Sequence, residues 1–320
     1  MLDVFYTVDV EIWCDGWSDI DRKFPDTFRK YIHGSTAKGD FGLPCQLEIL
    51  NDHGLTGAFF VEPLFSTRFG RQPLADIIGL IEDAGQELQL HLHTEWVDES
   101  IVPLLDDVQT KRQHLRMFTK DEQTTLIAAG IDLLRTAGGK PVNTFRAGSF
   151  AFNTDTLDAL AANHIYLDSS YNSSQFGPDS GVLPGITVVE PVVCRGVHEY
   201  PMTVFADGTG SLRHAQLTAI SFQEMEHLLW QAEAAGRTSF VILSHSFELL
   251  NKRKDRADEI VVDRFRRLCA FLDKNRSHFK VRGFQDLHPQ SVAVQPAPLQ
   301  SPLWRTGMRI ASQAYRRVYL

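Results

Sequence analysis

Segments typical of β-strands alternate with segments of helical periodicity along almost the whole chain. The expected strands are short, apolar and rich in β-branched and aromatic residues. They are Leu2–Val10, Thr56–Val61, Gln86–Leu92, Asn143–Arg146, Ile165–Asp168, Ser239–Ser244 and Lys280–Phe284. Such alternation implies parallel strands joined by right-handed helical crossovers. About seven units of this kind close better as a barrel than as an open sheet, so we predict an α/β barrel.

Two stretches of the chain depart from this alternation. Asp15–Asp40 is polar and contains Gly16, Pro25 and Gly34, so we expect a long loop there. Ile186–Cys194 is an apolar piece inside a loop-rich region, and we expect it to form an additional hairpin.

The C-terminal part differs in composition from the rest. Gln285–Pro302 contains several Pro and Ser residues and is expected to be a linker. Trp304–Leu320 has apolar residues at helical spacing and no acidic residue. Its arginines are Arg305, Arg309, Arg316 and Arg317. We therefore predict a barrel domain over residues 1–288, followed over 289–320 by a linker and a basic amphipathic helix. Residues 303–320 could pack on the domain or lie on a membrane surface.

Charge and cysteine content narrow the class of protein. The net charge of −8 and the sequence pI of about 5.8 argue against a nucleic-acid partner. The four cysteines are far apart and form no Cys-x-x-Cys pair, so neither a zinc knuckle nor a disulfide framework is indicated. No signal peptide and no membrane-spanning apolar run is visible. We expect a cytoplasmic protein, with membrane association open through the C-terminal segment.

Titratable side chains stand at or just after the ends of five expected strands. They are Asp9, Glu11, His91, His93, Glu95, Arg146, Asp168 and His245. In an α/β barrel the C-terminal ends of the strands meet on one face, where active sites lie. Each residue alone has an ordinary structural explanation, because a single His after a strand is more often structural than catalytic. Their recurrence at separate strand ends, beside apolar strand interiors, indicates one site.

The pair His91 and His93 indicates a metal. One residue separates them at the end of an expected strand, so both side chains point to the same face. A catalytic divalent metal needs about three protein ligands and an open position. Glu11, His91 and either His93 or Glu95 could supply them. We expect zinc, with cobalt, nickel and manganese as alternatives.

The other residues suit metal-assisted hydrolysis of an amide or ester. Asp9, a carboxylate beside the metal, could take a proton from the attacking water. Arg146 could hold Asp9 ionised and oriented. His245 could protonate the leaving group, and Leu243, two residues before it, could form the wall of a small acyl pocket.

These motifs, in their order, resemble those of the polysaccharide deacetylase (NodB-homology) family, carbohydrate esterase family 4. The resemblance extends over most of the chain and rests on Thr7–Glu11, Gly85–His91, Phe145–Phe150, Asp168–Ser170 and Leu243–His245. It implies a distorted (β/α)7 barrel and a carbohydrate substrate. It also implies Asp9 as the catalytic base, Arg146 as the residue that orients this base, and His245 as the general acid.

The ligand set departs from the family pattern. The metal-binding acid, Glu11, is displaced by one position. In the second motif, a His-x-x-x-His pair, His91 matches the first His, and Glu95 stands where the second is expected. His93 is an additional candidate. Alternation along a strand favours His93, whereas a chain that turns directly after His91 favours Glu95. The His-x-His-x-Glu-Trp sequence that ends at Trp96 looks like that of the WalW-like subgroup, which is associated with polysaccharide biosynthesis clusters.

The expected function is that of a metal-dependent hydrolase that removes an acetyl group from an N- or O-acetylated sugar. The sugar would belong to a polysaccharide or its lipid-linked precursor. Trp96, Phe150, Asp168 and Leu243 are expected to contact this substrate. Two alternatives stay open: a deformylase or another hydrolase of non-peptide C–N amides, and a catalytically inactive carbohydrate-binding barrel. An inactive barrel would be marked by a missing base or acid, and both Asp9 and His245 are present.

Overall fold

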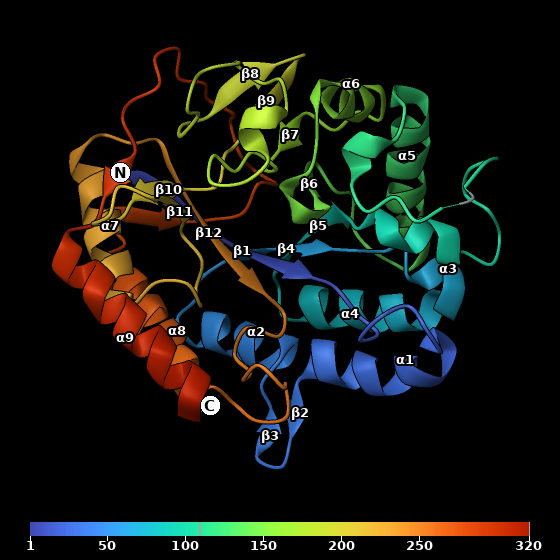
Figure 1. Ribbon diagram of the computed structural model, residues 1–320, viewed down its shortest axis with the longest axis horizontal. Helices are drawn as coiled ribbons and strands as arrows, with labels where there is room; N and C mark the ends of the chain where they lie inside the picture. Colours follow the sequence, from blue (N-terminus) through green and yellow to red (C-terminus); the bar gives the residue numbers. More distant parts are fainter. Residues whose placement is uncertain (109, 320) are drawn as a thin grey trace. The chain divides into compact units, whose positions relative to one another are not determined.

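A computed structural model describes residues 1–108 and 110–319 (Figure 1). The chain divides into two compact units, each built from separate stretches of sequence. The first unit contains residues 1–57, 203–282 and the chain from Pro298 onward; the second contains residues 58–202 and 283–297. Leu320, the last residue of the predicted C-terminal segment, lies outside the described residues. The predicted boundary at residue 288 stays a prediction.

The first unit is built around β1 (Leu2–Val10), whose apolar side chains are almost entirely buried. β1 pairs in parallel with β12 (Ser239–His245) and with β13 (Phe279–Val281). The register sets Asp9 opposite His245, at the C-terminal ends of both strands. Because parallel strands end at the same edge, two titratable residues from distant parts of the sequence become neighbours.

Three helices of the first unit pack against one another. They are α2 (Leu43–Asp52), α7 (Phe222–Ala234) and α8 (Glu259–Lys274). α8 contacts both α2 and α7 (Figure 1). The ring of Phe265 on α8 stacks on Tyr6 of β1 with the ring centroids 4.8 Å apart, so α8 covers β1. Ser221 caps α7 by accepting the backbone N–H of Glu224.

The prediction of a long loop over Asp15–Asp40 was wrong. The stretch contains α1 (Ile20–Phe28), a π-helical turn (Arg29–His33), β2 (Ser35–Thr36) and β3 (Gly39–Asp40). Ile20, Phe24 and Thr27 lie on one helical face and are buried. Burial of that face outweighs the breaking tendency of Pro25, which lies inside α1.

The second unit contains a mostly parallel sheet. Its strands, in spatial order, are β4 (Gly57–Val61), β5 (Glu87–Leu92), β6 (Thr144–Ala147), β7 (Leu167–Asp168), β9 (Val197–Glu199) and β8 (Val192–Cys194). β8 runs antiparallel to β9 and forms a hairpin with it. Only its first strand lies within the predicted stretch Ile186–Cys194, whose residues 186–191 form no strand. The helices are α3 (Ser66–Phe69), α4 (Arg71–Asp83), α5 (Lys120–Thr136) and α6 (Thr154–Ala162). α5 contacts α4 and α6 (Figure 1). The mixed α/β class predicted from the sequence is confirmed.

A small sheet and a terminal helix complete the first unit. The sheet consists of β10 (Val204–Ala206), β11 (Leu212–His214) and β14 (Leu299–Gln300), and the helix is α9 (Leu303–Tyr319). Arg309 of α9 is buried and pairs with Asp207 at 2.7 Å and with Glu224 at 3.2 Å. Among the side chains of α9 up to residue 316, the large exposed apolar ones are Leu303, Trp304, Met308, Ile310 and Tyr315.

α9 therefore packs through polar groups and turns apolar groups outward. Contact of residues 303–320 with a membrane surface stays a prediction. Among the described residues, no helix is both long enough and apolar enough to span a bilayer.

Candidate active site

In the first unit, Asp9, Glu11 and His245 lie at adjacent strand ends. Asp9 and Glu11 are buried, with 4% and 7% of their surface exposed. His245 Nε2 lies 3.9 Å from Glu11 Oε1. The structure thus brings three of the predicted site residues together within this unit.

Glu248 accepts a hydrogen bond from Nδ1 of His245. His245 Nδ1 lies 2.8 Å from Glu248 Oε1, and the backbone N–H of Thr218 donates to Glu248 Oε2 over 3.1 Å. Gln216 donates its side-chain amide to the same carboxylate. Because a carboxylate accepts, Nδ1 donates, and the ring presents Nε2 toward Glu11. Glu248 was not among the predicted site residues, although its position three residues after His245 was a usable signal.

The charge state of His245 follows from this environment. Burial lowers the pKa of His245, but the hydrogen bond to Glu248 and the negative charges of Glu11, Glu248 and Asp9 outweigh burial. The net effect raises the pKa of His245 to about 9. The imidazole is therefore prepared to carry a proton at neutral pH.

In the second unit, His91 is fixed by a backbone carbonyl. β5 and β6 place His91 opposite Arg146, and His91 Nδ1 lies 2.8 Å from the Arg146 carbonyl oxygen. A carbonyl only accepts, so Nδ1 carries the hydrogen and Nε2 carries the lone pair. This is the tautomer in which a metal-binding His is commonly held.

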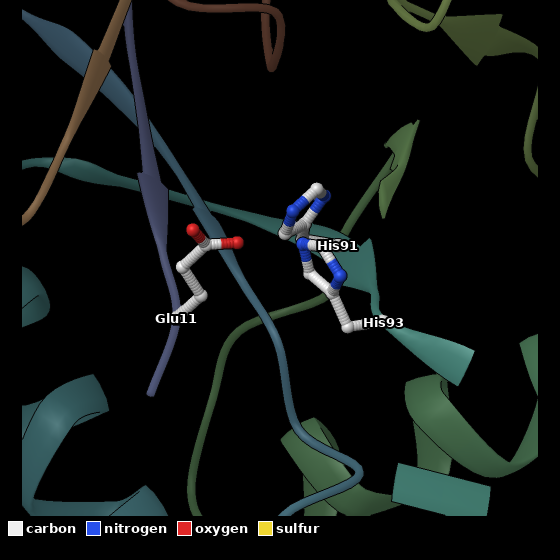
Figure 2. A group of neighbouring side chains, drawn as sticks. All are labelled: Glu11, His91 and His93. Carbon is white, nitrogen blue, oxygen red and sulfur yellow. The ribbon is translucent and has the colours of Figure 1, made fainter. Parts of the chain in front are cut away.

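His93 continues the extended backbone of β5 for one more residue. Its φ of −103° and ψ of 104° are extended, and the 3₁₀ helix Thr94–Glu99 begins immediately after it. The rings of His91 and His93 are 4.8 Å apart and almost perpendicular (Figure 2). His93 Nδ1 lies 3.3 Å from Glu95 Oε2, so Glu95 is its hydrogen-bond acceptor. Both imidazoles thus have Nδ1 engaged by an oxygen acceptor.

Glu11 forms a group with these two histidines. One ligand atom from each of Glu11, His91 and His93 lies within 4.8 Å of the others, and all three residues are buried. Figure 2 shows the Glu11 carboxylate directed toward the two imidazoles. The set consists of two nitrogen donors and one oxygen donor, which suits zinc and neighbouring divalent metals.

Arg146 lies beside a buried pair of carboxyl groups. Its guanidinium donates to the Ser169 carbonyl oxygen at 2.9 Å and to Ser169 Oγ at 3.1 Å. Asp168 and Glu199 are neighbours in the register of β7 and β9, and both are fully buried. Burial raises the pKa of both carboxyl groups, most for Glu199, whose pKa the charge of Asp168 raises further. Two acids in this contact cannot both ionise, so they share one proton.

The residues expected to contact substrate are all buried. Trp96, Phe150, Asp168 and Leu243 have exposed fractions of 1%, 7%, 0% and 2%. Phe150 and the preceding Ser149 both have positive φ, 57° and 54°, an arrangement that costs about 1–3 kcal/mol per residue. Such strain just after the strand that carries Arg146 is typical of functional loops. Contact of Trp96, Phe150, Asp168 and Leu243 with a substrate stays a prediction.

Glu62 is a second buried acid that was not among the predicted site residues. It follows β4 directly, is fully buried, and accepts the backbone N–H groups of Leu64 and Phe65 at 2.7 and 3.2 Å. Burial raises the pKa of Glu62 to about 8, although the electrostatic interaction with His93 lowers it. Its place immediately after an apolar strand was the available signal.

The sequence matches no protein-family model, and no curated protein matches it. Among solved structures, the chain is similar to a protein from Mycobacterium smegmatis provisionally described as a polysaccharide deacetylase. That similarity has a TM-score of 0.56 and 17% identity, and covers 92% of this chain and 95% of the other. It establishes that this chain has the same mixed α/β fold.

Two further structures match less well. A family 4 carbohydrate esterase from Streptomyces lividans, in complex with acetate, has a TM-score of 0.42 and 13% identity over 92% of this chain and 97% of the other. A family 4 pseudoenzyme from Bacillus anthracis has a TM-score of 0.43 and 13% identity over 86% of this chain and 62% of the other. With TM-scores below 0.5, neither supports an argument about this chain.

Proposed function

We propose that this protein is a metal-dependent hydrolase that removes an acetyl group from an acetylated sugar of a polysaccharide or its lipid-linked precursor. The observation that carries the proposal is the buried group of Glu11, His91 and His93, with ligand atoms within 4.8 Å of one another. The fold shared with a protein described as a polysaccharide deacetylase supports the substrate class. We propose a distorted (β/α)7 barrel as the complete architecture.

The three residues fit a divalent metal chemically. Each imidazole has its Nδ1 hydrogen directed at an oxygen, so the Nε2 lone pair is the donor. The carboxylate of Glu11 adds one negative charge, and three ligands leave a position open, as a catalytic metal requires. When bound, zinc would polarise the acyl carbonyl and acidify a water molecule. Cobalt, nickel and manganese are alternatives.

His93 is proposed as the ligand in preference to Glu95. The extended backbone through His93 keeps its side chain on the same face as that of His91. Glu95 lies two residues later and accepts a hydrogen bond from His93, which is the role of an orienting carboxylate. The His-x-His-x-Glu-Trp sequence also supports assignment to the WalW-like subgroup.

Asp9 and His245 each carry out one of the two proton transfers. Asp9 takes a proton from the attacking water, with Arg146 as its proposed orienting residue. His245 donates a proton from Nε2 to the departing amine or alcohol, while Glu248 holds Nδ1 and stabilises the protonated ring. A base and an acid on neighbouring strands would therefore act in turn, the base during attack of water and the acid during departure of the leaving group.

The test is acetate release from a panel of N- and O-acetylated sugars, with formylated amides included to reveal a deformylase. We expect release from at least one acetylated sugar, and a loss of at least 100-fold in Asp9→Asn and His245→Ala, typical of general base or acid removal. Full activity of either variant would contradict the assigned roles. Hydrolysis confined to formyl groups would replace the proposed substrate.

A further inference from the structure

The loop that follows β12 carries a lysine in an unusual setting. Lys254 has a positive φ of 56°, in the left-handed region that residues other than glycine rarely adopt. Its backbone N–H donates to the Asn251 carbonyl oxygen at 2.9 Å, and Asn251 Oδ1 accepts the N–H of Asp255 at 3.1 Å. The turn is thus closed by its own hydrogen bonds, and it holds Lys254 in a fixed place.

The ammonium group of Lys254 lies over two aromatic rings. Nζ is 4.8 Å from the ring centroid of Tyr31 and 4.8 Å from that of Phe247. The two rings meet edge to face at 5.1 Å. Phe247 in turn stacks on His245, with ring centroids 5.4 Å apart. One aromatic ring therefore connects the lysine to the proposed general acid.

Among the residues that the structure describes, no carboxylate forms an ion pair with Lys254, although the negative charges of Asp15 and Glu11 lie near enough to favour its charged form. Its Nζ makes no hydrogen bond or ion pair there. The nearby carboxylate of Asp15 already accepts from Lys30 at 2.8 Å and from the Tyr31 hydroxyl at 3.1 Å. Glu11 is assigned to the metal. The direct contacts of this half-buried ammonium group are therefore with the two aromatic rings.

Stabilisation of the folded chain does not account for this arrangement. A lysine over aromatic rings gains a cation–π attraction, but the left-handed backbone that places it there is unfavourable for a side chain with a Cβ atom. A strained residue that holds a charged group without a direct ion pair is better explained by an anion that binds from outside. The position beside Phe247 and His245 directs that anion to the leaving-group side of the site.

We propose that Lys254, held over Tyr31 and Phe247, binds an anionic group on the substrate sugar, either a phosphate or a carboxylate. The inference rests on the proposed function in taking an acetylated sugar as the ligand. It narrows the substrate class from acetylated sugars in general to acidic or phosphorylated ones.

The test measures binding, so that it does not depend on turnover. N-acetylglucosamine, N-acetylglucosamine 1-phosphate and N-acetylmuramic acid are titrated into the full chain by calorimetry at low and high salt. We expect one or both charged sugars to bind about tenfold or more tightly than the neutral sugar, as a charge-assisted contact gives. The preference should weaken with salt. The phosphate and carboxylate arms identify the anion.

Three variants make the assignment specific. Lys254→Met should abolish the preference for the charged sugar, and Lys254→Arg should retain most of it. Lys252→Met, which removes an exposed lysine from the same turn, should leave it unchanged. Equal binding of charged and neutral sugars, or an undiminished preference in Lys254→Met, would overturn the inference. Charged-sugar preference without any acetate release would retain the anion site and refute the deacetylase instead.

Discussion

The Nδ1 atom of His93 lies 3.3 Å from Oε2 of Glu95, and both side chains are buried. This contact assigns different roles to two residues that sequence motifs treat as competitors. A carboxylate that accepts a hydrogen bond from the imidazole nitrogen not bound to the metal raises the basicity of the imidazole and fixes the orientation of the ring. We therefore propose that Glu95 orients His93 and does not itself bind the metal.

The first prediction separates these roles by metal affinity. Glu95→Gln should weaken zinc binding about 10–100-fold, because it removes the orienting charge but leaves both imidazoles. His93→Ala should reduce affinity further, since it removes a ligand. Competition with a chromogenic chelator measures both constants. A larger loss of zinc affinity in Glu95→Gln than in His93→Ala would show that Glu95 is the ligand.

Gly148 gives a second prediction about the same imidazole. A Cβ atom at this position would lie 2.8 Å from His93 Nδ1 and 2.7 Å from the Leu92 carbonyl oxygen. Gly148→Ala must therefore displace the His93 ring, and we expect about tenfold weaker zinc binding and about 1–3 kcal/mol lower stability. Gly79→Ala is the matched control, because a Cβ there meets nothing within 4 Å. It should be neutral or stabilising by about 0.5–1 kcal/mol. Equal behaviour of the two variants would show that His93 is not confined by Gly148.

The pair Asp168 and Glu199 predicts a pH dependence. The pKa of each carboxyl is raised in the folded chain, so the folded state binds more protons than the unfolded state above a pH of about 4. Stability from this pair is complete below the unfolded pKa and falls as the pH rises through the folded pKa, by about 1.4 kcal/mol per pH unit for one proton. Glu199→Gln keeps a hydrogen-bonding partner for Asp168 and removes this titration.

Urea unfolding between pH 5 and pH 9 tests this. Relative to the wild type, Glu199→Gln should gain stability as the pH rises. Taking the difference between the two proteins cancels the contributions of Glu62 and His245, which titrate in both. Parallel stability curves would contradict the shared proton.

Arg309 provides a prediction about α9. Its guanidinium pairs with Asp207 and Glu224, and all three side chains are buried. Arg309→Met leaves the buried Glu224 without this cation, whereas Asp207 keeps its ion pair with Arg213 at 2.7 Å. The loss should cost about 3–5 kcal/mol. Arg22→Met breaks an exposed pair with Asp19 and should cost less than about 1 kcal/mol. Thermal unfolding compares them, and a small effect at Arg309 would mean that α9 contributes little to the stability of the first unit.

Local periodicity predicted the elements that carry the site, but not the contacts that orient its residues. The extended backbone continues from β5 through His93, and His91 and His93 direct ligand atoms to one group, as alternation predicted, because strand geometry is local. The role of Glu248 depends on a turn after β12 and on Gln216 from a distant loop. The contact of Asp168 with Glu199 depends on which strands pair, and short-range patterns carry no such information. The misassigned α1 shows that one buried face outweighs a proline signal.

The central claim is that hydrolysis requires a metal held by Glu11, His91 and His93. The most direct measurement is acetate release by one preparation of the full chain, before chelation, after chelation and dialysis, and after addition of one equivalent of zinc. We predict that chelation abolishes release, that zinc restores it, and that Glu11→Gln is not restored at the same zinc concentration. Acetate release that survives complete removal of metal would contradict the account.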